Sequence, residues 1–288
     1  MLRIALPNKG RLSEQTRELF QDAGLDVRTD SPRALIASLG GEFEALFVRA
    51  QDIPEFVADG AADVGVTGFD LVRESGRELE SLLDLGFGRC RLVLATHDER
   101  GVASADAMPA GTRVATSFPR LAREFFAARG LEAVIVPVSG AAEIAPHIGI
   151  ADVVVDLSST GSTMKVNGLR ELDTLLESSA RLVARPGAAE GDTARARSVR
   201  ELVVALASVL RARGQRYVMA NVPRVSLDRV REVLPGLNGP TVTEVMDGGR
   251  FVAVHAVVPA QTLYRTIADL KTLGAEGILV TRIERLLP

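Results

Sequence analysis

The chain has 288 residues, 47% hydrophobic and 25% charged, a composition typical of a globular protein with about two domains, or three. The net charge of -3 and the pI near 5.8 argue against a surface that grips nucleic acid by bulk electrostatics, so an anionic ligand needs a local site. The single cysteine, Cys90, excludes a disulfide framework, and the three histidines (His97, His147, His255) lack the spacing of zinc ligands.

The N-terminal segment MLRIALPNKGRL has too short an apolar run for a signal peptide. No later segment approaches the roughly 20 apolar residues of a membrane span. Together with the low cysteine content, these features predict a cytoplasmic protein that is neither exported nor embedded in a membrane.

A weak internal repeat organises the first two thirds of the chain. Residues 3–27 resemble residues 113–136, and each copy predicts a strand, a polar loop, a helix and a second strand, a βαβ unit. GAADVGVTG at 60–68 matches GIADVVVDLSSTG at 149–161, so each copy ends in another buried strand and a polar loop with glycine. The repeat predicts two similar α/β lobes around a cleft, with ligands at the carboxyl ends of the strands.

The last third of the chain has a different order of elements. After a loop at 184–198, apolar spacing predicts a helix at 199–213 that packs on the first lobe. From Gln215 on, the order strand, helix, hairpin, helix, strand is the ferredoxin-like βαββαβ order, with the DGG turn at 247–249 inside the hairpin. By analogy, such small modules bind amino acids or join subunits.

The stretch ADVVVDLSSTGSTM, residues 151–164, runs from a buried strand into a hydroxyl-rich loop around Gly161. The loop leads into a short helix predicted at 162–166, whose N-terminus offers unpaired N–H donors and partial positive charge. Glycine permits close backbone approach, and Ser and Thr add donors without bulk. A phosphate group fits these features; the competing interpretation is a Ser/Thr cap and turn without a ligand.

The segment EIAPHIGIADVVVDLSSTGSTM, residues 143–164, resembles the pattern of the ATP phosphoribosyltransferase family. The positions that carry the resemblance are Glu143, Gly149, Ala151, Asp156, Thr160, Gly161 and Thr163. It extends over nearly the whole chain through PNKGRL, VRAQDIP, GVTGFD, LGFGRCRL and ATSFPRL. The C-terminal module is similar to that of the long form of the family, which carries its own regulatory domain.

The resemblance implies an α/β fold of two periplasmic-binding-protein-like lobes around a cleft, followed by a ferredoxin-like, ACT-like regulatory domain. It divides the chain into lobe I on the ATP side (1–92 and 184–213), lobe II on the phosphoribosyl pyrophosphate side (93–183) and a histidine-binding domain (214–288). The implied reaction transfers the 5-phosphoribosyl group from phosphoribosyl pyrophosphate to N1 of ATP and releases pyrophosphate. It is the committed first step of histidine biosynthesis, which histidine inhibits.

The resemblance also implies Mg²⁺, which binds mainly through the pyrophosphate group of the substrate; it does not identify protein ligands of the metal. It further implies a homo-oligomer, in which dimers assemble into a hexamer. Glu143 and Asp156 are the implied catalytic carboxylates, placed to accept hydrogen bonds from the ribose hydroxyls. The implied phosphoribosyl pyrophosphate site comprises Ser159, Thr160, Gly161, Ser162 and Thr163. The implied ATP site comprises Lys9, Gly10, Arg11, Arg49, Gly68 and Asp70, and the implied histidine site comprises Asn221, Thr241 and Ala275.

Several of these residues have a plain structural alternative. Glu143 is also a suitable acid for a helix N-terminus, and Asp156 and Asp70 are suitable caps. Arg11 is also explained as a solvated charge, and Arg49 as the partner of nearby Asp52. We interpret Cys90 as a packing residue because no histidine lies beside it in the sequence.

Two other classes of protein share part of the pattern. A two-lobed small-molecule binding protein has the lobe repeat and the anion loop, although its exported versions need a signal peptide. An amino-acid-sensing regulatory subunit has the C-terminal module but no use for the full pattern from Glu143 to Thr163. An assay of product formation from ATP and phosphoribosyl pyrophosphate separates all three.

Overall fold

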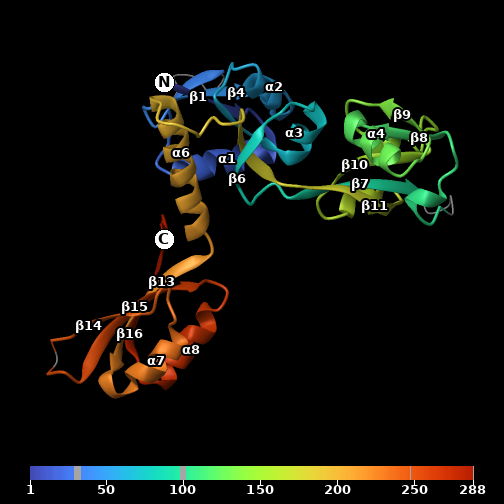
Figure 1. Ribbon diagram of the computed structural model, residues 1–288. Coiled ribbons are helices and arrows are strands. Elements are labelled where there is room, and N and C mark those ends of the chain that lie inside the picture. The colour runs from blue at the N-terminus through green and yellow to red at the C-terminus, as the bar shows by residue number, and fades with distance from the viewer. Residues whose placement is uncertain (29–33, 98–101, 247, 288) are drawn as a thin grey trace. The chain divides into compact units, whose positions relative to one another are not determined.

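The computed structural model describes residues 1–28, 34–97, 102–246 and 248–287 (Figure 1). The chain divides into two compact units, Met1–Val203 and Val204–Pro288, and the boundary lies inside helix α6 (Ala194–Ala212). In the described part, the first unit holds a seven-stranded and a five-stranded sheet, and the second unit holds a four-stranded sheet. We call the two halves of the first unit lobe I and lobe II, after their sheets.

Lobe I is built on the seven-stranded sheet, in the order β2-β3-β4-β1-β5-β12-β6. Its strands are β1 (Leu2–Pro7), β2 (Val27–Arg28), β3 (Ile36–Leu39), β4 (Phe43–Val48), β5 (Val64–Gly68), β6 (Glu80–Asp84) and β12 (Ala180–Ala184). Its helices are α1 (Gly10–Asp22), the 3-10 turn η1 (Ala50–Asp52), α2 (Ile53–Ala58) and α3 (Phe69–Ser75). Strands β4, β1 and β5 are parallel neighbours, so their carboxyl ends lie at one edge of the sheet.

Lobe II is built on the five-stranded sheet, in the order β11-β7-β10-β8-β9. Its strands are β7 (Cys90–His97), β8 (Thr112–Thr116), β9 (Ala133–Pro137), β10 (Val153–Ser158) and β11 (Leu169–Ser178). Its helices are α4 (Pro119–Ala128) and α5 (Ser162–Val166), with the 3-10 turns η3 (Ala105–Ala107) and η4 (Ala142–Ile144). Strands β10, β8 and β9 are parallel, and Val153 and Val155 of β10 lie in the same core cluster as Phe125 and Phe126 of α4.

The predicted βαβ repeat is complete in lobe II and altered in lobe I. In lobe II, β8, α4 and β9 form the expected unit, because β8 and β9 pair in parallel. In lobe I, β2 is a two-residue strand that pairs with β3, and β4 is the neighbour of β1 instead. Residues 3–27 and 113–136 therefore share their first strand and their helix, but their second strands pair differently.

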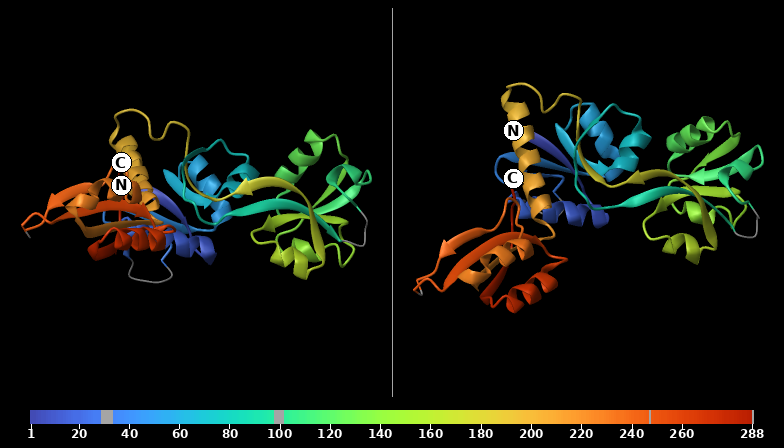
Figure 2. Two further views of the ribbon diagram at one scale, coloured as in Figure 1. Left: turned by 90° about the horizontal axis from the view of Figure 1, so that it is seen from below. Right: turned by 60° about the horizontal axis from the view of Figure 1, so that its bottom comes forward.

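The chain passes between the lobes twice, from β6 to β7 and from β11 to β12 (Figures 1 and 2). The crossings are held together by backbone hydrogen bonds, including those from Leu85 N–H to Ala180 O at 3.0 Å and from Ala180 N–H to Phe87 O at 2.9 Å. Strand pairing places β12 in lobe I from Ala180 on and β7 in lobe II from Cys90 on. The chain thus enters the lobe II sheet at Cys90, before the expected residue 93, and returns to the lobe I sheet at Ala180, before the expected residue 184.

Helix α6 begins at Ala194, earlier than the predicted Val199. The Thr193 side chain accepts the N–H of Ala196 at 3.1 Å, which is the geometry of an N-cap. Alanine and arginine favour the helix, so the segment ARARS extends α6 towards this cap instead of forming a loop.

The second unit has the predicted βαββαβ order. Its elements are β13 (Gln215–Pro223), the 3-10 turn η5 (Arg224–Ser226), α7 (Leu227–Val233), β14 (Thr241–Glu244), β15 (Phe251–Pro259), α8 (Leu263–Thr272) and β16 (Glu276–Arg282). The antiparallel sheet has the order β14-β15-β13-β16, and α7 and α8 lie on one of its faces (Figure 1). From Val218 on, every second residue of β13 is buried in a cluster with Val230 of α7 and Leu270 of α8. The predicted hairpin is β14–β15; Asp247 of its turn lies outside the described residues.

Candidate functional site

The two predicted catalytic carboxylates lie close together at the carboxyl edge of the lobe II sheet. Asp156 is near the end of β10, and Glu143 is in η4, which follows β9. Burial raises the pKa of Asp156, a hydrogen bond from Leu157 N–H lowers it, and the negative charge of Glu143 raises it again. Ala141, just before η4, has a φ of 50°, a conformation that costs a non-glycine residue about 1–2 kcal/mol. The fold thus maintains a strained turn beside a pair of acids.

The hydroxyl-rich loop follows β10, and α5 begins at Ser162 as predicted. Ser159, Thr160 and Ser162 are exposed, and the hydroxyls of Thr160 and Ser162 are 2.8 Å apart. Thr163 lies in α5, and its side chain is outside the described part. The loop therefore presents accessible hydroxyl groups next to the carboxylate pair.

Position 161 favours glycine because of its backbone conformation, since there is room for a larger side chain. Its φ is +75°, and a Cβ built on it would meet only the Glu171 carboxylate, at 3.6 Å, an ordinary contact. Glycine tolerates this φ, while other residues are strained by it. The carbonyl of Gly161 accepts the N–H of Lys165 at 3.1 Å, so this conformation also starts α5.

Glu171, which the sequence did not suggest, holds the strand below this loop. One of its carboxylate oxygens accepts the Ser158 hydroxyl at 2.7 Å, and the other pairs with Arg91 at 2.9 Å. The three residues lie on β11, β10 and β7, and only pairing between distant strands brings them together. No local sequence pattern signals such a contact.

The predicted ATP residues gather at the carboxyl ends of three neighbouring strands in lobe I. Lys9, Gly10 and Arg11 follow β1, Arg49 follows β4, and Gly68 and Asp70 stand at the end of β5 and the start of α3. Asn8 N–H donates to Val48 O at 2.9 Å and joins the ends of β1 and β4. Lys9, Arg11 and Arg49 are exposed, and in the described ranges Arg49 forms no ion pair with Asp52. Three cationic side chains are therefore open to an anionic ligand.

Asp70 differs from these residues because its side chain is buried, with 5% of the residue exposed. Its carboxylate accepts the hydroxyl of Ser178, which stands at the crossing from β11 to β12. Burial raises the pKa of Asp70, and the hydrogen bonds from Ser178 and from its own backbone lower it. A Cβ at Gly68 would collide with the Asp70 carboxylate, so this glycine has a packing role in addition to the predicted one.

Cys90 lies beside Asp70. Burial and the nearby charge of Asp70 raise the pKa of the thiol to about 11, while a hydrogen bond with Ser178 lowers it. A thiol with this pKa is protonated at neutral pH and is a poor nucleophile. The geometry agrees with the interpretation of Cys90 as a packing residue.

A cavity of about 330 Å³ lies between the hydroxyl loop and the crossing strands. It is lined by Asp84, Arg89, Cys90, Arg91, Ser159, Glu177, Ser178, Ser179 and Arg181. Arg181 pairs with Asp84 at 3.2 Å, so charges of both signs alternate around the cavity. The cavity connects the environment of Asp70 with the loop that follows β10.

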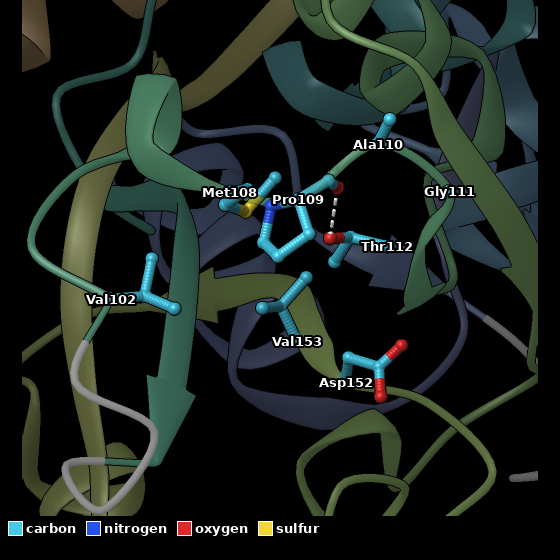
Figure 3. A pocket seen from close by; sticks show the side chains of 8 residues that line it. All are labelled: Val102, Met108, Pro109, Ala110, Gly111, Thr112, Asp152 and Val153. Carbon is cyan, nitrogen blue, oxygen red and sulfur yellow. Dashed lines mark hydrogen bonds between the residues drawn. The ribbon is translucent and has the colours of Figure 1, made fainter.

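A second cavity, of about 360 Å³, lies at the opposite edge of lobe II (Figure 3). It is lined by residues at the amino ends of β8 and β10, where the Thr112 hydroxyl donates to Pro109 O at 2.6 Å. Asp152 is held there by Arg113 at 3.0 Å. Because ligands of parallel sheets bind at the carboxyl ends of strands, this cavity is the weaker candidate.

The three residues predicted to bind histidine do not all lie together within one chain. Asn221 on β13 pairs with Glu276, the neighbour of Ala275, so these two positions are adjacent. Thr241 on β14 pairs with His255 on β15, and β15 separates β14 from β13. Thr241 is thus two strands away from Asn221 and level with Met219, so the two positions are more than roughly 10 Å apart.

Two features of the described part of the chain limit the kinds of site it can hold. None of its helices combines the length and the apolar character needed to cross a membrane. Within the same residues, no three His, Cys, Asp or Glu side chains cluster in a way that could hold a metal ion. Glu143 and Asp156, beside the hydroxyl loop, are two acids that could share a metal with a substrate.

Comparison with known proteins indicates the family of the chain. The model of the ATP phosphoribosyltransferase family matches residues 49–208, and the model of the HisG C-terminal domain matches residues 212–285. An ATP phosphoribosyltransferase from Gemmatimonas aurantiaca is 68% identical over 100% of both chains, and one from Methanopyrus kandleri is 47% identical over 100% of both. The structure of the ATP phosphoribosyl transferase (HisG:HisZ) complex from Thermotoga maritima covers 73% of this chain and 99% of its own, with a TM-score of 0.65 and 28% identity.

These matches span both lobes and the C-terminal module, and they confirm the resemblance drawn from residues 143–164. They also confirm the predicted fold, α/β lobes followed by the family's C-terminal domain. The chain belongs to the ATP phosphoribosyltransferase family, the pentosyl-transferring enzymes of the first step of histidine biosynthesis.

Proposed function

We propose that this enzyme transfers the 5-phosphoribosyl group of phosphoribosyl pyrophosphate to N1 of ATP, giving N1-(5-phosphoribosyl)-ATP and pyrophosphate. The observation that carries the proposal is the acid pair Glu143 and Asp156 beside an exposed hydroxyl loop at the carboxyl edge of lobe II. The exposed cations Lys9, Arg11 and Arg49 at the corresponding edge of lobe I complement the triphosphate.

In this proposal lobe II binds the donor. The 5-phosphate accepts hydrogen bonds from the backbone and the hydroxyls of residues 159–163, next to the first turn of α5. Glu143 and Asp156 accept hydrogen bonds from the two ribose hydroxyls. As the bond from C1 to pyrophosphate breaks, the ribose becomes electron-poor, and the two carboxylates stabilise that charge.

Lobe I binds the acceptor. Asp70 or its neighbouring backbone accepts a hydrogen bond from the adenine amino group, and this orients N1 toward C1 of the ribose. Adenine N1 is unprotonated at neutral pH, so the attack needs no strong base. N1 displaces pyrophosphate with inversion at C1, and positioning of the reactants supplies most of the acceleration.

A magnesium ion fits this site through the donor. Mg²⁺ prefers one or two carboxylates together with substrate phosphates, and Glu143 and Asp156 lie next to the phosphate loop. When bound, Mg²⁺ neutralises charge that develops on the departing pyrophosphate.

We also propose the cellular setting. The protein works in the reducing cytoplasm as a homo-oligomer, from dimer to hexamer, and histidine inhibits it through Asn221, Thr241 and Ala275 of the C-terminal domain (214–288). Since Thr241 lies two strands from Asn221, we place the primary contacts at Asn221 and Ala275.

The decisive experiment mixes the protein with ATP, phosphoribosyl pyrophosphate and Mg²⁺ and follows the N1-substituted adenine nucleotide. A two-lobed binding protein or a regulatory subunit gives no product. Asp156→Asn keeps the shape of the side chain but removes its charge, so we expect kcat to fall more than ATP affinity. Asp152→Asn, at the opposite edge of the same sheet, is the matched control. A variant Asp156→Asn that loses only ATP affinity contradicts the assigned role.

A further inference from the structure

Helix α3 of lobe I caps helix α4 of lobe II. One carboxylate oxygen of Glu74 accepts the N–H of Arg120 at 2.9 Å, and the other accepts the N–H of Leu121 at 3.0 Å. These two amides are in the first turn of α4, where backbone donors have no partner within the helix. An acid from one lobe therefore satisfies the helix start of the other.

Other residues of α3 add to this contact. Leu71 packs against the core cluster of lobe II, and Arg73 pairs with Glu124 of α4 at 3.8 Å. The Arg120 guanidinium lies so close to Gly76, which follows α3, that a Cβ there would collide with it. Helix α3 directly follows β5 of lobe I, and its side chains contact α4 of lobe II. A movement of α3 relative to lobe II would therefore break these contacts.

The same helix carries Asp70, one helical turn before Glu74. Ser178 at the lobe crossing holds the Asp70 carboxylate, and Phe69 N–H donates to Ser179 O at 3.0 Å. The two ends of one short helix thus contact the proposed adenine site and the first turn of α4. Asp70 and Glu74 are thus held in a fixed relation by the helix that contains both.

We propose that Glu74 is a positioning residue that couples ATP binding in lobe I to the placement of lobe II. ATP at Asp70 fixes α3, and Glu74 then fixes α4 and the loops at the carboxyl edge of the lobe II sheet. This brings C1 of the donor to N1 of adenine. The inference rests on the proposed function, because it assumes that ATP binds at Asp70.

The experiment compares hydrogen exchange at the start of α4, in a peptide covering residues 118–124, with and without ATP and no phosphoribosyl pyrophosphate present. In the wild-type protein, we expect ATP to slow exchange of the Arg120 and Leu121 amides, although its proposed contacts are in lobe I. In Glu74→Gln, one acceptor becomes an N–H donor that opposes a backbone N–H, so the response to ATP is lost. Glu124→Gln, which removes the exposed ion pairs of the same interface and spares the cap, keeps the response.

Steady-state kinetics distinguishes positioning from simple stabilisation. We expect Glu74→Gln to lower kcat roughly 10- to 100-fold, since a misplacement of about 1 Å between reacting groups has an effect of this order. The KM of each substrate, measured with the other at saturation, changes much less, and Glu124→Gln resembles the wild type.

The outcomes separate the two proposals. If the wild-type protein forms no N1-substituted nucleotide, the proposed function is wrong. If the wild type is active but Glu74→Gln has normal kcat and lowers only the thermal midpoint, the coupling role is overturned. If Glu74→Gln does not fold, the wild-type exchange decides alone: unchanged exchange at residues 118–124 on adding ATP overturns the coupling.

Discussion

At the scale of single residues, the burial of Asp70 opposes stability at neutral pH, whereas its proposed role in ATP binding favours the charge. Burial raises its folded-state pKa above the usual 3.8. An acid with a raised folded-state pKa contributes stability that is fully present below its unfolded pKa and is lost as the pH rises through its folded pKa. At neutral pH the buried charge therefore destabilises the fold, by about 1.4 kcal/mol for each unit of pKa shift.

Asp70→Asn removes this charge and keeps an oxygen that accepts the Ser178 hydroxyl. We expect the variant to have a higher free energy of unfolding than the wild type at neutral pH, and the difference to shrink as the pH falls toward 3.8. We also expect weaker ATP binding. Urea unfolding over this pH range measures the first effect; lower stability of the variant at neutral pH would show that other groups compensate the charge.

Gly161 allows a test of the loop conformation with a matched control. Alanine fits the space but not the φ of +75°, so Gly161→Ala strains the loop by about 1–2 kcal/mol. We expect the KM for phosphoribosyl pyrophosphate to rise roughly tenfold, with little change for ATP. Gly111 has a φ of +78° and open space in the same lobe, so Gly111→Ala carries the same strain away from the loop. Equal effects of both variants on KM would mean that the strain acts on the whole lobe.

The contrast between Thr160 and Glu171 explains what the sequence could reveal about the site. The hydroxyl loop and α5 were predictable because every residue involved lies within a short segment. Glu171 was not, because it reaches Arg91 on β7 and Ser158 on β10 across the β11–β7 pairing, which contains two register shifts. Burial of Asp70 was hidden in the same way, since it depends on Ser178, far away in the chain.

At the scale of elements, features that depend on local sequence could be predicted, whereas the pairing of distant strands could not. The C-terminal module was predictable because its strands alternate and its hairpin has a turn signal, both local features. The second strand of the first repeat was misleading, since the sequence of Val27 and Arg28 does not reveal that β4 occupies the place beside β1. The beginning of α6 was a local signal that was overlooked, the N-cap at Thr193.

This cap can be tested directly. Removing an N-cap hydroxyl costs about 1 kcal/mol, so we expect Thr193→Ala to lower the free energy of unfolding by this amount and to reduce helicity slightly. Thr193→Ser keeps the hydroxyl and should restore most of the stability. Chemical denaturation followed by circular dichroism measures both. If the alanine and serine variants have the same stability, Thr193 does not act as a cap.

At the scale of the whole molecule, the proposed catalytic site and the proposed histidine site belong to different units. The acid pair, the hydroxyl loop and the cations all lie before Val203, and Asn221 and Ala275 lie after it. Histidine bound in the second unit can inhibit only if it favours an arrangement or assembly with poorer catalysis. Such couplings are typically about 1–3 kcal/mol, or roughly 5- to 150-fold in affinity.

We therefore expect a chain that ends at Arg213, and so keeps the whole of α6, to form product and be insensitive to histidine. Removal of residues 214–288 also breaks the hydrogen bond from Leu286 N–H to Ser208 O, so its activity can be reduced. For this reason the full-length variant Asn221→Ala is measured alongside it, and we expect normal activity without histidine and weaker inhibition with it. Initial rates over a range of histidine concentrations measure both effects. Inhibition that persists in the shortened chain would place the histidine site in the lobes, because every proposed contact in the C-terminal domain is then absent.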